Sequence, residues 1–219
     1  MKFGSAALVG GTAAAGMASA AAGYYAFSPS DKEERVISSL LSEDPSRRAI
    51  ADNEDWSSAW SKYKASNKDV WDLKNSDAEV PEVFKTACKN RLESKVSGRD
   101  SEGYRDFVSY CTRDTLVSDL IKDRGKELLD KSKGGSDAGW IKVWKDYISD
   151  DRNKSKAKDG DIWKLTGWET ENSKNDKAPD VFMTACESNA KKPIYDFNNS
   201  LFLDTFKFCT KDTSVSVGV

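Results

Sequence analysis

The chain contains one stretch twice: Pro81-Glu82-Val83-Phe84-Lys85-Thr86-Ala87-Cys88, and Pro179-Asp180-Val181-Phe182-Met183-Thr184-Ala185-Cys186. The second copy lies 98 residues after the first, since 186 − 88 = 98. The same offset relates YCTRDT at residues 110–115 to FCTKDT at residues 208–213. A pattern that returns at a fixed spacing is the signature of a duplicated structural unit. The sequence therefore predicts a tandem of two related repeats.

The two repeats also match upstream of this stretch, at smaller offsets. A W-x3-W-x2-Y pattern occupies residues 56–63 and 140–147, and a D-[VI]-W-x-L pattern occupies residues 69–73 and 161–165. The offset grows from 84 (140 − 56) to 92 (161 − 69), which indicates insertions in the second repeat, normally in loops. We predict three segments: a signal peptide or N-terminal membrane anchor at 1–30, the first repeat at 31–113 and the second repeat at 114–219.

Apolar residues in both repeats recur with a helical period. Trp56, Ala59, Trp60 and Tyr63 fall at i, i+3, i+4 and i+7, which places them on one helix face. The predicted fold class is all-α, with an N-terminal hydrophobic helix followed by two tandem, related small helical bundles. We interpret the recurring aromatic residues as core anchors, with an aromatic ligand platform as the alternative. They are Trp56, Trp60, Tyr63, Trp71, Trp140, Trp144, Tyr147 and Trp163.

The four cysteines follow the repeats. Within each repeat the two cysteines are 23 residues apart, since 111 − 88 and 209 − 186 both equal 23. This equal spacing on two helices predicts one disulfide per repeat, Cys88–Cys111 and Cys186–Cys209. Two pairs of buried free thiols are the alternative, and a zinc site made by all four cysteines is disfavoured because no CxxC pair is present.

Residues 6–27 form an uncharged, Ala- and Gly-rich segment that follows Lys2. About 20 apolar or small residues can span a bilayer as a helix. A cleaved signal peptide, an uncleaved signal anchor and a flexible tail are the three readings, and the anchor is preferred. We expect the protein to contact the membrane through residues 6–27. We expect its location to be the cell membrane, facing the outside, or secretion.

The composition argues against several classes of function. The chain has 34 Lys and Arg against 36 Asp and Glu, so it lacks the basic excess that nucleic-acid binding requires. It has no histidine, which excludes Ser-His-Asp and Cys-His catalysis. No phosphate-binding loop or GxSxG nucleophile motif occurs. We therefore expect no enzyme activity, no cofactor, no metal site and no nucleic-acid partner, and the sequence does not specify an oligomeric state.

The whole design resembles the paralogous families of short hypothetical proteins in hemotropic mycoplasmas. The resemblance rests on the N-terminal segment KFGSAALVGGTAAAGMASAAAGYYAFSPS at residues 2–30 and on the YCTRDT and FCTKDT elements within Lys-, Glu- and Ser-rich helical units. It implies a non-enzymatic, membrane-anchored or secreted surface protein for host interaction or antigenic display, with a host surface protein as partner. The alternative is a ligand-binding protein, or an enzyme, that uses a cleft between the two repeats.

Overall fold

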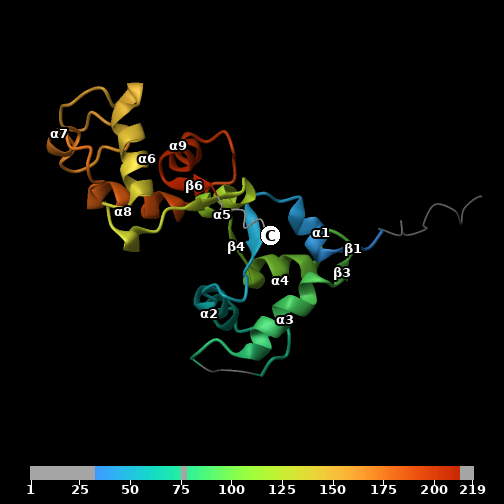
Figure 1. Cartoon of the computed structure of the whole chain (residues 1–219). Coiled ribbons are helices and arrows are strands. Elements are labelled where there is room, and N and C mark those ends of the chain that lie inside the picture. Colours follow the sequence, from blue (N-terminus) through green and yellow to red (C-terminus); the bar gives the residue numbers. More distant parts are fainter. Residues whose placement is uncertain (1–32, 75–77, 213–219) are drawn as a thin grey trace, which may run out of the picture. The chain divides into compact units, whose positions relative to one another are not determined.

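Short helices and very short antiparallel strands make up both repeats (Figure 1). The computed structural model describes residues 33–74 and 78–212, and residues 34–219 group as one compact unit. The first repeat runs through β1 (Arg35–Val36), α1 (Ile37–Ser42), β2 (Arg47–Ala49), α2 (Ser57–Ala65), α3 (Glu82–Leu92), β3 (Lys95–Val96), α4 (Glu102–Cys111) and β4 (Thr112–Asp114).

The second repeat follows the same order with additions. Its elements are α5 (Val117–Asp123), β5 (Lys126–Leu128), η1 (Lys131–Lys133), α6 (Ala138–Ser149), η2 (Asp151–Asn153), α7 (Trp168–Glu171), α8 (Asp180–Ala190), α9 (Ser200–Phe208) and β6 (Thr210–Asp212). An isolated bridge between Leu116 and Pro193 takes the place of the β1–β3 pair. The 3-10 turn η2 and the short helix α7 lie in the long connection before α8, where the growing offset predicts inserted residues.

The all-α prediction was wrong, because six short strands pair within the described part of the chain. They form three two-stranded antiparallel sheets, β1–β3, β2–β4 and β5–β6. In the first repeat Arg47 lies opposite Asp114, and in the second Lys126 lies opposite Asp212. Their charged groups approach to 3.0 and 3.1 Å. A ribbon of three residues per strand is too short to show the alternation that identifies a strand in sequence.

The predicted N-terminal hydrophobic helix is likewise not supported. Residues 6–27, on which the prediction rests, lie outside the described residues. Across residues 33–74 and 78–212, no helix is long and apolar enough to cross a membrane.

An aromatic cluster fills the core of each repeat with the same geometry. Trp56 and Phe84 meet edge-on with ring centroids 6.1 Å apart, and Trp140 and Phe182 do the same at 6.1 Å. Offset or edge-to-face contacts of this kind are the favourable ones for aromatic rings. Of the predicted aromatic anchors, six are buried and two are half-buried. The buried ones are Trp56, Trp60, Tyr63, Trp140, Trp144 and Tyr147, and the half-buried ones are Trp71 and Trp163.

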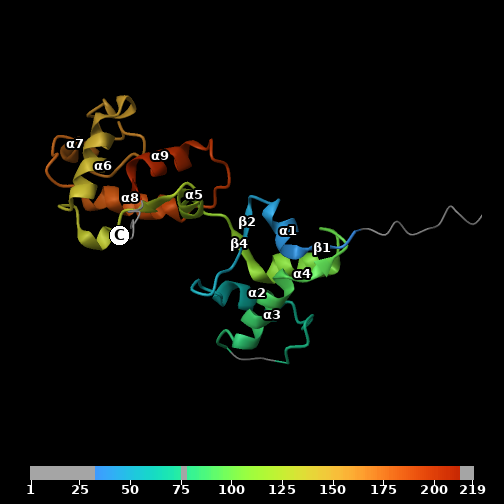
Figure 2. The same ribbon diagram turned by 45° about the vertical axis from the view of Figure 1, so that its right-hand side comes forward.

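Both predicted disulfides are present. Cys88 in α3 is bonded to Cys111 at the end of α4, and Cys186 in α8 is bonded to Cys209 directly after α9. The two α-carbons are 5.5 Å apart in each bridge. In both views α3 and α4 lie side by side (Figure 1 and Figure 2). The disulfide therefore fixes α3 against α4 in the first repeat and α8 against α9 in the second.

Removal of either bridge should destabilise its repeat. Each closes a loop of 23 residues, and the chain-entropy relation gives about 3 kcal/mol of unfolding free energy for such a loop. Cys88→Ala, Cys111→Ala and the double variant should lose about the same amount, since one bond is lost in each case. Denaturant unfolding measures the loss, with Cys186→Ala as the matched variant in the second repeat. Additive losses from the two single variants would contradict a shared covalent bond.

Candidate functional site: the junction between the repeats

No linker separates the two repeats. The last strand of the first repeat, β4, runs directly into Thr115, which is fully buried. The backbone N–H of Thr115 donates to the carbonyl of Ser46 in the first repeat at 2.9 Å. Its carbonyl accepts from the N–H of Ile194 in the second repeat at 3.1 Å. Thr115 thus joins the two repeats through its own peptide groups.

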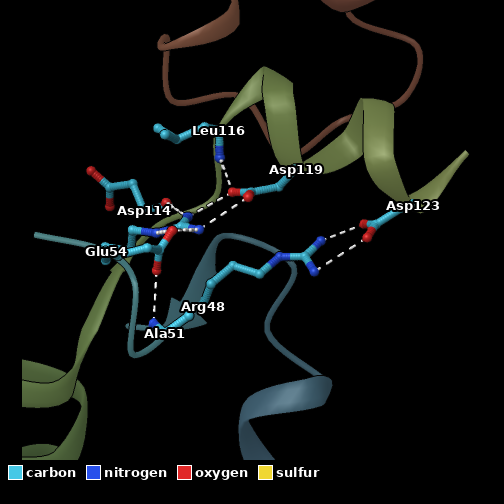
Figure 3. Close-up of polar contacts among 8 residues, drawn as sticks. Arg48, Ala51, Glu54, Asp114, Leu116, Asp119 and Asp123 are labelled. Atoms are coloured by element: carbon cyan, nitrogen blue, oxygen red, sulfur yellow. Dashed lines mark hydrogen bonds and ion pairs between the residues drawn. The ribbon is translucent and has the colours of Figure 1, made fainter. Parts of the chain in front are cut away.

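Arg113 is the centre of a charge cluster beside Thr115. Figure 3 shows its two acidic partners, Glu54 and Asp119. Its Nε donates to Glu54 Oε1 at 2.8 Å, which connects β4 to the loop before α2. Its Nη1 and Nη2 donate to the two carboxylate oxygens of Asp119 at 2.6 and 3.0 Å, which connects β4 to α5. A guanidinium that binds two carboxylates through several N–H groups fixes the orientation of the paired groups as well as the distance between them.

The two carboxylates are held by backbone groups as well. Glu54 Oε2 accepts from the N–H of Ala51 at 2.8 Å, and Asp119 Oδ2 accepts from the N–H of Leu116 at 2.8 Å. Asp119 lies in the first turn of α5, where a negative charge is favoured by the unpaired N–H groups of the helix. The cluster is therefore a closed set of ion pairs rather than a group of free acids.

The pKa values of the cluster follow from these contacts. The hydrogen bond to Asp119 raises the pKa of Arg113 above its usual range. Burial raises the pKa of Asp119 and of Glu54, but the hydrogen bonds from Arg113 and from the backbone lower them by more. Both carboxyl groups therefore have a pKa below the usual value and are charged at neutral pH.

A second ion pair crosses between the repeats nearby. Both Nη atoms of Arg48 in β2 donate to the carboxylate of Asp123 at the end of α5 (Figure 3). A pocket of about 450 Å³ opens beside this pair. It is lined by Ser38, Leu41, Ser42, Asp44, Pro45, Arg47, Arg48, Ala49, Leu92, Leu120, Asp123, Tyr195 and Phe197.

This pocket has an apolar floor. The side chains of Leu41 and Leu120 are buried beneath it, and the ring of Tyr195 is 55% exposed at its rim. A pocket of about 530 Å³ before α8 is larger, but mostly polar loop residues line it. The junction pocket combines apolar walls with a few polar groups, as small-ligand sites do.

The predicted aromatic anchors perform a structural role away from the junction. The hydroxyl of Tyr147 donates to Asp161 at 2.5 Å and accepts from the N–H of Trp163 at 3.1 Å. Asp161 Oδ1 in turn accepts from the N–H of Leu165 at 3.0 Å, which closes a tight turn. Burial and the hydrogen bond to Asp161 raise the pKa of Tyr147 well above its ordinary value. The D-x-W-x-L pattern thus encodes a turn that is anchored to the core by a tyrosine.

The first repeat contains the same turn. Tyr63 donates to Asp69 at 2.7 Å and accepts from the N–H of Trp71 at 3.0 Å. Burial and the contact with Asp69 raise the pKa of Tyr63 to about 12. The residues at equivalent positions within the turns, Asp72 and Lys164, both have a φ of 52°. The duplication therefore extends to an unusual backbone conformation that non-glycine residues seldom adopt.

The sequence prediction did not identify the junction site. The cysteines and aromatic anchors that it named lie in the two cores, whereas Arg113, Glu54 and Asp119 lie between them. One signal was available in the matched elements YCTRDT and FCTKDT, which differ at Arg113 against Lys211 as well as at Tyr110 against Phe208. Lys211 forms an ion pair with Glu127 of the same repeat, at 3.3 Å.

Comparison of the chain with models of known protein families, with curated proteins and with solved structures finds no match. No group of three or more Cys, Asp or Glu side chains that could hold a metal ion occurs among the described residues. The disulfides and the geometry of the junction are therefore the features of the described residues that bear on function.

Loss of Arg113 should destabilise the protein in a pH-dependent way. Arg113→Gln should cost about 2 kcal/mol at neutral pH, because it leaves two partly buried carboxylates without a cation. The pKa of each carboxyl group is lowered by folding, so the stabilisation is present above the unfolded pKa. It is lost as the pH falls through the folded value. The cost should therefore shrink below about pH 4.

Lys211→Gln is the matched control, since Lys211 occupies the same position in the second repeat and makes an exposed ion pair. Its cost should stay below about 1 kcal/mol. Urea unfolding of both variants across pH measures the difference. Equal costs for the two variants, or a cost for Arg113→Gln that does not depend on pH, would show that the cluster is not a stabilising charge network.

Proposed function

We propose that this chain is an exported, non-enzymatic surface protein whose two repeats serve host interaction or antigenic display. The observation that carries the proposal is the pair of disulfides at equivalent positions. Structural disulfides form and persist in oxidising surroundings and are typical of extracellular or secreted proteins. Because a disulfide occurs at the equivalent position of both repeats, it is a feature of the repeat fold rather than of one local site.

The resemblance to surface proteins of hemotropic mycoplasmas supports the same proposal. In that setting, residues 6–27 would direct export and hold the protein at the membrane, and a host surface protein would be the partner. The junction charges also favour a binding role over catalysis. Arg113, Glu54 and Asp119 are engaged with one another, so none of them is poised to exchange a proton at neutral pH.

A second candidate function rests on the junction pocket. Its volume of about 450 Å³ lies within the range of small-molecule sites, and residues of both repeats line it. A ligand-binding protein that uses this cleft would need the relative placement of the two repeats to be fixed. The contacts of Arg113 and Arg48 support such a fixed placement.

Protease treatment of intact cells that express the full chain tests export. If the protein is exported, an added protease should cleave it beyond about residue 30, at exposed loops such as that around Tyr195. A cytosolic marker protein in the same cells should remain intact. Fractionation then separates the two forms of export, because a retained anchor leaves the chain in the membrane fraction and a cleaved signal releases it. A full-length chain that is protected from protease and recovered with the cytosol would contradict the proposal.

A further inference from the structure

Arg47 lines the junction pocket, and its guanidinium has hydrogen-bond donors beyond the one that approaches Asp114. Arg47 Nη1 approaches Asp114 Oδ1 at 3.0 Å, and within the described residues this is its only side-chain contact. Its neighbour Arg48, by contrast, uses both Nη atoms on Asp123. Arginine has five N–H donors in a planar fork that suits a carboxylate. Arg47 can therefore accept a second anion.

The carboxylates around the pocket each have partners or can move away. Asp123 is paired with Arg48, and Asp44 accepts hydrogen bonds from the N–H and the hydroxyl of Ser46 at 3.0 and 2.6 Å. The side chain of Asp114 is 56% exposed, so it can turn toward water at little cost when a ligand binds to Arg47. Arg47 is therefore the lining cation that can exchange its partner for an incoming carboxylate.

Apart from Ser38 and Ser42, the remaining lining is mostly apolar. Leu41 and Leu120 form the buried floor, and Leu92 and Phe197 extend it as half-buried walls. The exposed ring of Tyr195 at the rim would lose water contact when a ligand occupies the pocket. Removal of apolar surface from water contributes about 25 cal/mol of favourable free energy per Å². Covering these walls therefore favours a ligand with a hydrocarbon body.

We propose that the junction pocket binds a small amphipathic monoanion, with a hydrocarbon body on the leucine floor and a carboxylate on Arg47. This proposal rests on the second candidate function, ligand binding between the repeats, and names its ligand class. It differs from that function in requiring the anionic group. A pocket that binds apolar molecules regardless of charge would satisfy the function and not the proposal.

Calorimetric titration of the full chain with decanoate and with decanol, each below its aggregation limit, tests the proposal. The two probes share a hydrocarbon chain and differ in the head group. Decanoate should bind with one-to-one stoichiometry and about tenfold more tightly than decanol, the effect of one charge-assisted hydrogen bond. Arg47→Gln should reduce the affinity for decanoate to that for decanol, and Arg47→Lys should retain part of the difference.

Lys126→Gln is the control variant. Lys126 faces Asp212 across β5–β6 as Arg47 faces Asp114 across β2–β4, but it does not line the junction pocket. It should leave the affinity for decanoate unchanged, and circular dichroism should show that every variant is folded. Equal affinity for decanoate and decanol would overturn the proposal and leave ligand binding standing. The absence of saturable binding of either probe would overturn both.

Discussion

The disulfide between the last two helices is the constraint on which each repeat depends. A repeat of about 80 to 100 residues buries a thin core, so one covalent bond is a large part of its stability. The bond fixes α3 against α4 and thereby holds Phe84 against Trp56, which precedes α2, and Trp60 within α2. It also positions the ribbon, because the carbonyl of Cys111 accepts from the N–H of Ile50 at 3.0 Å. The carbonyl of Cys209 accepts from the N–H of Leu129 at 2.9 Å in the second repeat.

The junction follows from the same arrangement. Once the ribbon β2–β4 is formed, its final strand leads without a linker into the buried Thr115 and the start of α5. Arg113, which is part of that strand, then reaches Glu54 on one side and Asp119 on the other. The position of the pocket, and hence any ligand binding in it, is a consequence of how the first repeat ends. The proposals of export and of ligand binding are compatible, since export is inferred from the disulfides and ligand binding from the junction pocket.

The sequence was sufficient to predict the duplication, the pairing of the cysteines and the main helices, because each of these leaves a periodic or repeated signal. It was insufficient for the strands. RRA in β2 and KEL in β5 are polar, three residues long and paired only through contacts remote in sequence. It was also insufficient for the junction, because Arg113 and Glu54 are 59 residues apart and the second repeat has Lys211 instead of arginine. The comparison of the repeats marks Arg113 as different from Lys211, but it does not identify the partners of Arg113.

The most direct test of the account is the redox state of the cysteines in protein isolated from its native source without reductant. Alkylation of the unfolded chain followed by peptide mapping should find no free thiol, and should find the peptide of Cys88 joined to that of Cys111. The peptide of Cys186 should be joined to that of Cys209. Four alkylated cysteines would contradict the account, because both the stability of the repeats and the argument for export would then lose their basis.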